Sequence, residues 1–332
     1  MSDLVRITDV SPRDGLQNEP LRADGSAIPA RDKLELIRRL AMAGVDEIEV
    51  TSFVSPKWVP QLGDGAEVVR GAASLVARES ALWPGQPEFS VLIPNLKGLE
   101  GLEAADESGC EAAGIDPPMI RKIGLFTAAS EAFAKKNTNA TIAETIERFR
   151  EVMARASVNA SVVRGYISCV VACPFEGEVS AAKVGEVAAM LVDLGVSEID
   201  LGDTIGAGTP ETIARMLAAV SKRVGAGWFR RKAVTLHLHD TRGTAASCVE
   251  EALRFGVRSF DGAVGGLGGC PYASTPGKRA PGNIATETLV RTVHAAGYET
   301  MVDEEALAEA GAFARSLVGR GGEERSDDGA LS

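Results

Sequence analysis

Two of the three histidines, His237 and His239, lie two residues apart in a segment whose polarity alternates as in a β-strand. Because alternate side chains of a strand point to the same face, both imidazoles are on one face. In a closed barrel this face points to the central axis, where the ring nitrogens of the two residues converge. The pair therefore indicates a metal site, and two hydrogen-bonded core histidines are the structural alternative.

Other β-like segments also end in polar residues that an apolar core would exclude. The polar residues at these ends are Arg13, Asp14, Glu49, Thr51, Ser52, Asn95 and Asp203. An unpaired carboxylate is costly to bury, so their presence favours a polar site over a purely structural core. Carboxylate, imidazole and carbonyl ligands together suit Mg²⁺ or Mn²⁺, with Zn²⁺ as an alternative. We therefore predict that Asp14, His237 and His239 bind a divalent metal ion.

Short apolar segments rich in β-forming residues alternate along the chain with segments that have apolar residues at helical spacing. The eight expected strands are Val5–Asp9, Glu47–Val50, Phe89–Ile93, Ile120–Phe126, Val163–Val170, Glu198–Leu201, Val234–Leu238 and Val257–Asp261. Eight such units predict an α/β fold of the TIM (β/α)8 barrel type with a short C-terminal extension. The active site of this fold lies at the carboxyl ends of the strands, where the polar residues occur.

The connecting segments give further expectations. Helices are clearest at Arg31–Ala43, Ile142–Ala156, Ala181–Leu194 and Pro210–Val220. Four glycines, each expected to end a helix directly before the next strand, are Gly44, Gly109, Gly195 and Gly256. Residues 79–88, which include Trp83, predict an exposed loop, and residues 111–119 predict a lengthened connection.

Domain limits follow from the same pattern. Residues 1–300 are expected to form the catalytic barrel, and residues 301–318 a C-terminal helix that packs on it. Residues 319–332 have too little apolar surface to offset the entropy of ordering, so a disordered tail is predicted.

Composition excludes several classes of protein. The net charge of −11 argues against nucleic acid as a partner, and no segment has the about 18 consecutive apolar residues of a membrane span. The start of the chain does not resemble a secretory signal, and the five cysteines are scattered and odd in number. Reduced thiols and a cytoplasmic location are therefore expected.

A glycine-rich segment, Gly265–Pro271, follows the eighth expected strand and contains Cys270. It is either a tight turn or a flexible lid that brings Cys270 to a reacting centre and excludes water. The glycine spacing matches neither a dinucleotide-binding fingerprint nor a phosphate-binding loop.

Several long motifs, taken together, closely resemble those of 3-hydroxy-3-methylglutaryl-CoA lyases. They occur in the same order through nearly the whole expected barrel, so chance agreement is an inadequate explanation. The motifs are Ser11–Glu19, Glu49–Gln61, Pro94–Gly98, Ala128–Glu131, Lys135–Asn137, Arg164–Tyr166, Cys173–Gly177, Leu201–Gly206, His237–Thr241, Gly266–Tyr272 and Gly282–Glu287.

The resemblance implies a metal-dependent retro-Claisen cleavage of 3-hydroxy-3-methylglutaryl-CoA to acetyl-CoA and acetoacetate. It implies that the metal ligands are Asp14, His237, His239 and Asn283. The implied catalytic residues are Arg13, which polarises the substrate, Cys270 and His237, which are candidates for proton transfer, and the carboxylates Glu49 and Asp203. The residues expected to bind the acyl-CoA substrate are Arg13, Gln17, Ser52, Asn95, Lys136 and Asn137.

Three departures from the lyase motifs concern the acyl group. Residues 274–281 are longer and more basic than the usual link, Phe175 replaces a tyrosine, and Arg242 replaces an aromatic residue. A close 3-hydroxyacyl-CoA analogue is therefore an alternative substrate.

Two other functions are weighed against the lyase. A Claisen-type acyltransferase of the isopropylmalate synthase group would be favoured by a long C-terminal regulatory domain. A silent CoA-binding barrel would be favoured by loss of a metal ligand. Neither a membrane nor nucleic acid is expected as a partner, and a homodimer is an expected assembly.

Overall fold

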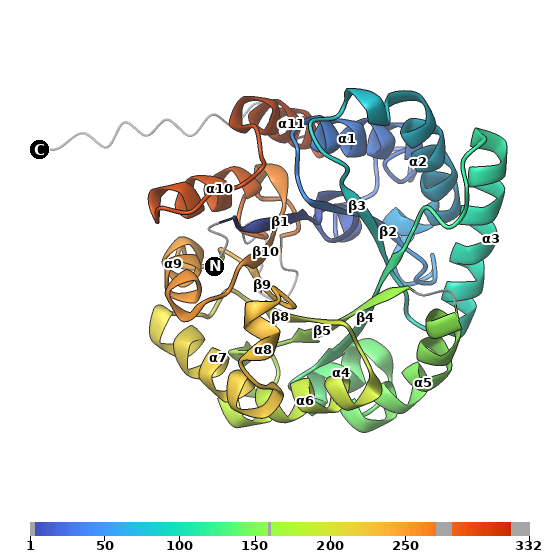
Figure 1. The fold of residues 1–332 in the computed structure, drawn as a ribbon. Helices are drawn as coiled ribbons and strands as arrows, with labels where there is room; N and C mark the ends of the chain where they lie inside the picture. Colours follow the sequence, from blue (N-terminus) through green and yellow to red (C-terminus); the bar gives the residue numbers. More distant parts are fainter. Residues whose placement is uncertain (1–3, 159–160, 270–280, 320–332) are drawn as a thin grey trace, which may run out of the picture.

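The computed structural model describes residues 4–158, 161–269 and 281–319 (Figure 1). Eight parallel strands close a barrel in the order β1-β10-β9-β8-β5-β4-β3-β2. Their bounds are β1 Arg6–Asp9, β2 Glu47–Ser52, β3 Glu88–Leu92, β4 Lys122–Ala128, β5 Val162–Ser168, β8 Glu198–Asp203, β9 Val234–Leu238 and β10 Ser259–Gly262. Each expected strand overlaps an observed one, so the predicted TIM (β/α)8 barrel is confirmed.

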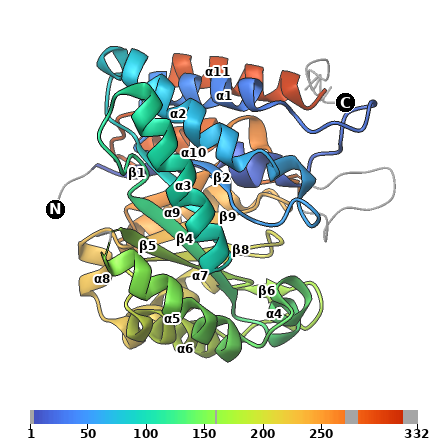
Figure 2. The ribbon, with the colours of Figure 1, turned by 90° about the vertical axis from the view of Figure 1, so that its right-hand side faces the viewer.

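Helices surround the barrel (Figure 1). Their bounds are α1 Ala30–Met42, α2 Gly65–Glu79, α3 Leu96–Ala113, α4 Glu131–Thr138, α5 Ile142–Val158, α6 Ala181–Leu194, α7 Pro210–Val224, α8 Gly227–Arg230, α9 Ala245–Phe255, α10 Thr286–Ala295 and α11 Glu304–Leu317. Helix α11 packs beside α1 (Figure 2). A small antiparallel hairpin of β6 Ala172–Cys173 and β7 Gly177–Glu178 lies after β5. None of the helices in the described ranges has the length and hydropathy that a membrane span requires.

Gly44, Gly195 and Gly256 follow helices with positive φ, as predicted. The prediction for Gly109 is wrong, because α3 continues past it and ends before Gly114, which has φ 70°. Gly109 serves close helix packing instead: a Cβ there would lie 2.8 Å from the Cα of Arg70 on α2.

The segment between α2 and β3 is exposed or partly exposed, as the sequence predicts, except at Trp83. Residues Ser80–Leu82 form a 3-10 turn, and Trp83 is buried with its ring centroid 6.2 Å from that of Phe89. Within 111–119, the first three residues belong to α3, so the connection is shorter than expected. In both places tertiary packing overrides the local turn composition.

Charged side chains fill the barrel at the amino ends of its strands. The six residues of this ionic network, each from a different strand, are Arg6, Glu47, Glu88, Lys122, Arg164 and Glu198. They contact one another across the barrel, so they point to its axis, where aliphatic side chains fill most barrels of this type. The three cations balance the three carboxylates, which burial requires.

Glu47 is the centre of this network. Its Oε2 atom lies 2.9 Å from Lys122 Nζ, 2.7 Å from Arg164 Nη2 and 2.8 Å from Arg6 Nη2. The Glu47 side chain is fully buried, so its charge is compensated by protein groups alone.

We expect Glu47→Gln to lower the free energy of unfolding by about 3–5 kcal/mol, because it leaves buried cations without their carboxylate. Urea unfolding measures the change. Glu147→Gln is the control: it breaks the exposed pair between Glu147 and Arg150, 2.6 Å apart, and should change stability very little. Equal losses in both variants would contradict a special role for the buried network.

Candidate active site and metal centre

Arg13 and Asp14 lie on a buried π-helical turn, Ser11–Gly15, directly after β1. Asp9 holds this turn in place, since its carboxylate accepts hydrogen bonds from the Ser11 amide at 2.9 Å and the Thr286 hydroxyl at 2.6 Å. Burial raises the pKa of Asp9 to about 6, although these hydrogen bonds oppose the shift. The turn therefore aims two charged side chains at the carboxyl end of the barrel.

His237 lies on β9, and His239 is the residue directly after this strand. Asn283 pairs with His239 in an isolated bridge, and the Ile284 amide donates to the Leu238 carbonyl at 2.8 Å. The segment around Asn283 thus runs beside the end of β9. Asn283 Nδ2 donates to Asp14 Oδ2 at 2.8 Å, which joins this segment to the turn after β1.

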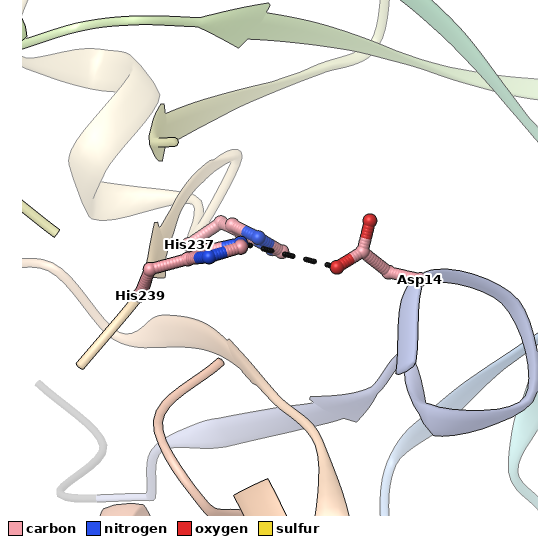
Figure 3. Close-up of side chains that lie close together, drawn as sticks. All are labelled: Asp14, His237 and His239. Atoms are coloured by element: carbon pink, nitrogen blue, oxygen red, sulfur yellow. Dashed lines mark ion pairs between the residues drawn. The ribbon is translucent and has the colours of Figure 1, made fainter. Parts of the chain in front are cut away.

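Asp14, His237 and His239 form a buried group in which one atom of a metal-binding type from each residue lies within 4.8 Å of the other two (Figure 3). We call these three residues, with the adjoining Asn283, the metal group. Both imidazole rings point toward the Asp14 carboxylate, and His239 Nε2 is 3.9 Å from Asp14 Oδ2. Asn283 Oδ1 is buried, and no hydrogen-bond donor in the described ranges reaches it. A buried acceptor without a donor is costly, so the donor set fits a cation that prefers oxygen and imidazole ligands.

Electrostatics keep two of these residues in the protonation state that can bind a metal ion. Burial raises the pKa of Asp14, but the charges of Arg13, His237 and His239 outweigh burial and lower it to about 2. Burial and the charge of His237 lower the pKa of His239 to about 4. At neutral pH Asp14 is a carboxylate and His239 a neutral imidazole, as metal binding requires.

Arg13 is clamped between two carboxylates beside this group. Its Nε atom donates to Glu49 Oε2 at 2.5 Å and its Nη1 atom to Asp14 Oδ1 at 2.6 Å. The guanidinium carbon is 5.7 Å from the ring centroid of Tyr166, whose hydroxyl donates to Glu49 Oε1 at 3.1 Å. Burial raises the pKa of Glu49, an effect that Arg13 opposes. The cation is thus fixed in one orientation.

Two other predicted residues, Gln17 and Asp203, lie near the group, and a third, Ser52, is buried at the end of β2. Gln17 Nε2 donates to Asp14 Oδ1 at 2.5 Å. Asp203 accepts hydrogen bonds from the amides of Ala207 and Gly208, so it holds the loop after β8, and burial raises its pKa. Ser52 ends β2 with a buried hydroxyl that makes no hydrogen bond to the described residues.

Three of the remaining predicted residues lie at the start of α3 or on α4. Asn95 caps α3, where its side chain accepts a hydrogen bond from the Gly98 amide at 3.0 Å. Lys136 and Asn137 are on α4, and Lys136 Nζ is 5.9 Å from the ring centroid of Phe175. Cys270 lies outside the described residues.

Barrel order explains this division. The residues that surround Asp14 and the two histidines come from or follow β2, β1, β10, β9 and β8, which are consecutive neighbours in the ring. These residues are Glu49, Arg13, Asp14, Asn283, His237, His239 and Asp203. Asn95 follows β3, and Lys136 and Asn137 follow β4, on the other arc. Substrate binding by these three residues stays a prediction.

Sequence reasoning missed four buried residues around the group: Tyr166, Arg164, Asp200 and Asp261. Asp261 contacts His237, and burial together with the charge of Asp261 raises the pKa of Asp200 well above its usual range. The available signal was the spacing of polar residues: Arg164 and Tyr166 are two positions apart on β5, as are His237 on β9 and His239 directly after it. Polar residues at this period on an expected barrel strand face the axis.

Comparison with known proteins places the chain in a family. The HMGL-like family model matches residues 4–313. Mitochondrial hydroxymethylglutaryl-CoA lyase of Gallus gallus is 44% identical over 95% of this chain and 94% of its own length.

Two solved structures are also similar. HMG-CoA lyase from Brucella melitensis has a TM-score of 0.82 and 42% identity, covering 95% of this chain and 99% of that one. An HMG-CoA lyase from Acinetobacter baumannii, in complex with coenzyme A and 3-methylmalate, has a TM-score of 0.80 and 32% identity, covering 100% and 99%. The chain therefore belongs to the HMGL-like family.

Proposed function

We propose that this chain is a metal-dependent carbon–carbon lyase that cleaves 3-hydroxy-3-methylglutaryl-CoA to acetyl-CoA and acetoacetate. The observation that carries the proposal is the buried group of Asp14, His237 and His239 beside the clamped Arg13, in a member of a family with named lyases. The direct test is release of acetyl-CoA from that thioester by the purified chain.

The reaction removes the proton of the C3 hydroxyl and breaks the C2–C3 bond, and the acetyl-CoA enolate then takes up a proton. A divalent ion held by Asp14, His237, His239 and Asn283 would supply a Lewis acid that makes the alkoxide less costly. Arg13 contributes fixed positive charge. Its Nε and Nη1 atoms are bound by carboxylates, and its Nη2 atom makes no hydrogen bond to the described residues, which leaves it for a substrate oxygen.

Arg13 needs no reorganisation to act in this way. Because Glu49 and Asp14 already hold the guanidinium in one orientation, its charge would be in place before the enolate charge develops on the substrate. Fixed charge of this kind stabilises a transition state more than mobile water does. We propose His237 and Cys270 for the proton transfers, and Glu49 and Asp203 as supporting carboxylates.

Cleavage is favoured over the alternatives. A synthase of the isopropylmalate type makes carbon–carbon bonds with similar ligands, but the full-length similarity is to lyases. A silent CoA-binding barrel would not need four residues of metal-binding types close together, as Asp14, His237, His239 and Asn283 are.

The acyl chain is open to test because the Acinetobacter neighbour binds coenzyme A together with 3-methylmalate. A panel of 3-hydroxyacyl-CoA thioesters, assayed for acetyl-CoA release, ranks the candidate substrates.

We further propose Mg²⁺ or Mn²⁺ as the ion, a role in leucine degradation, and a homodimer, which sedimentation tests. A cytoplasmic location, tested by fractionation, agrees with four described cysteines that are buried and free.

Removal of metal by chelation should abolish turnover, and Mg²⁺ or Mn²⁺ should restore it. His239→Ala should weaken Mn²⁺ binding by more than about tenfold, since even partners of metal ligands contribute about 10–100-fold. Asn283→Ala should weaken binding less, because a neutral carbonyl contributes less charge. Calorimetric titration with Mn²⁺ measures both, and full activity after rigorous chelation would reject the metal requirement.

Arg13→Lys should keep the fold and metal binding but reduce kcat by about 10²–10³-fold, as loss of one preorganised donor does. A compact ammonium cannot engage Glu49, Asp14 and substrate together as a planar guanidinium does. Steady-state kinetics measure the loss of kcat, and a melting curve checks that the fold is kept. Unimpaired turnover in a folded variant would mean that Arg13 only orients the turn through its ion pair with Asp14.

Cys270→Ser should slow turnover while largely keeping substrate binding, because a hydroxyl is a far weaker acid than a thiol with a pKa of about 8.5. Cys270→Ala should be at least as slow if the thiol transfers a proton. Near-normal kcat in Cys270→Ala would end the catalytic assignment.

A further inference from the structure

His237 contacts a carboxylate on the side of its ring that faces the next strand. Its Nδ1 atom is 3.4 Å from Asp261 Oδ2, and both side chains are buried. The two residues are direct partners in the register of β9 and β10, so the strands themselves set this contact. His239 differs, since its Nδ1 atom is buried and no group in the described ranges hydrogen-bonds to it.

The Asp261 carboxylate also lies close to a cation of the ionic network. Arg164 Nη1 lies 3.5 Å from Asp261 Oδ1, and the same guanidinium binds Glu47 and Glu198 of the ionic network. Asp261 therefore has a cation on one oxygen and an imidazole on the other. A carboxylate can only accept a hydrogen bond, so the His237 Nδ1 atom has to carry the hydrogen.

His237 thus belongs to two groups of close ligand-type atoms. One contains Asp14 and His239, and the other contains Asp200 and Asp261. If Nδ1 is committed to Asp261, the Nε2 lone pair is the ring atom left for a cation or for substrate. The contact with Asp261 in the second group therefore determines which ring nitrogen of His237 is available to the first group.

We propose that Asp261 is a positioning residue that fixes His237 as the Nδ1–H tautomer and directs its Nε2 lone pair into the metal group. This inference rests on the proposed function, because it assigns Asp261 a part in the same site. The competing explanation is that Asp261 only neutralises Arg164. That role would affect stability alone and would leave the His237 tautomer and metal affinity unchanged.

The chain has three histidines, so ¹⁵N NMR can follow each imidazole separately. At a pH where all three rings are neutral, wild-type His237 should show hydrogen on Nδ1, with signals assigned from His239→Gln and His294→Gln variants. In Asp261→Asn the side-chain amide can donate to Nδ1, so the Nε2–H tautomer should increase. Calorimetry should then show Mn²⁺ affinity lower by about 10–100-fold.

Ser259→Ala is the matched control. Ser259 and Thr235 lie two residues before Asp261 and His237 on the same strands, with their hydroxyl oxygens 2.9 Å apart. The variant removes this hydrogen bond between β9 and β10 without touching His237. Its tautomer and Mn²⁺ affinity should match those of the wild type.

A wild-type His237 with hydrogen on Nε2 would overturn the proposal, and so would a folded Asp261→Asn protein with unchanged tautomer and Mn²⁺ affinity. If Asp261→Asn does not fold, the wild-type tautomer alone decides. Neither readout depends on turnover. The expected NMR and Mn²⁺ results in a chain without lyase activity would therefore reject the proposed function and keep the inference.

Discussion

Every charge inside this barrel has to be compensated by another protein group, because removing an ion from water costs several kcal/mol even in a relaxed protein. At the amino ends of the strands, three cations form ion pairs with three carboxylates: Lys122, Arg6 and Arg164 with Glu47, Glu88 and Glu198. At the carboxyl ends, Arg13 forms ion pairs with Glu49 and Asp14. Aliphatic side chains in the interior would have been easier to stabilise. With polar side chains in their place, the barrel axis carries charges in fixed positions.

Arg164 connects the two ends. It binds Glu47 and Glu198 through Nη2 and lies 3.5 Å from Asp261 through Nη1. Asp261 in turn contacts His237 of the metal group. The side chains that hold the site are therefore continuous with those that stabilise the base of the barrel. A site anchored in this way keeps its geometry through strand register, which loops alone could not provide.

Local patterns in the sequence predict the strands, the barrel and the metal group, because each depends on alternation or on residue type at a strand end. They do not predict the ionic network, since Arg6 and Glu198 are 192 residues apart and meet only when the barrel closes. They also cannot separate Gly109, which packs against α2, from Gly114, which ends α3. Asn95 illustrates the same limit: a polar residue after a strand can cap the next helix as readily as it can bind substrate.

The metal group also lies across the seam at which the barrel closes. Asp14 follows β1 and Asn283 follows β10, and these strands pair directly although the two side chains are 269 residues apart in sequence. His237 and His239 come from β9, the next strand in the ring. These four residues therefore come together only in the closed barrel. A cation bound by all four would stabilise the closed barrel over an open one, because the unfolded chain does not hold these residues together. Folding and formation of the site are thus coupled at the same pair of strands.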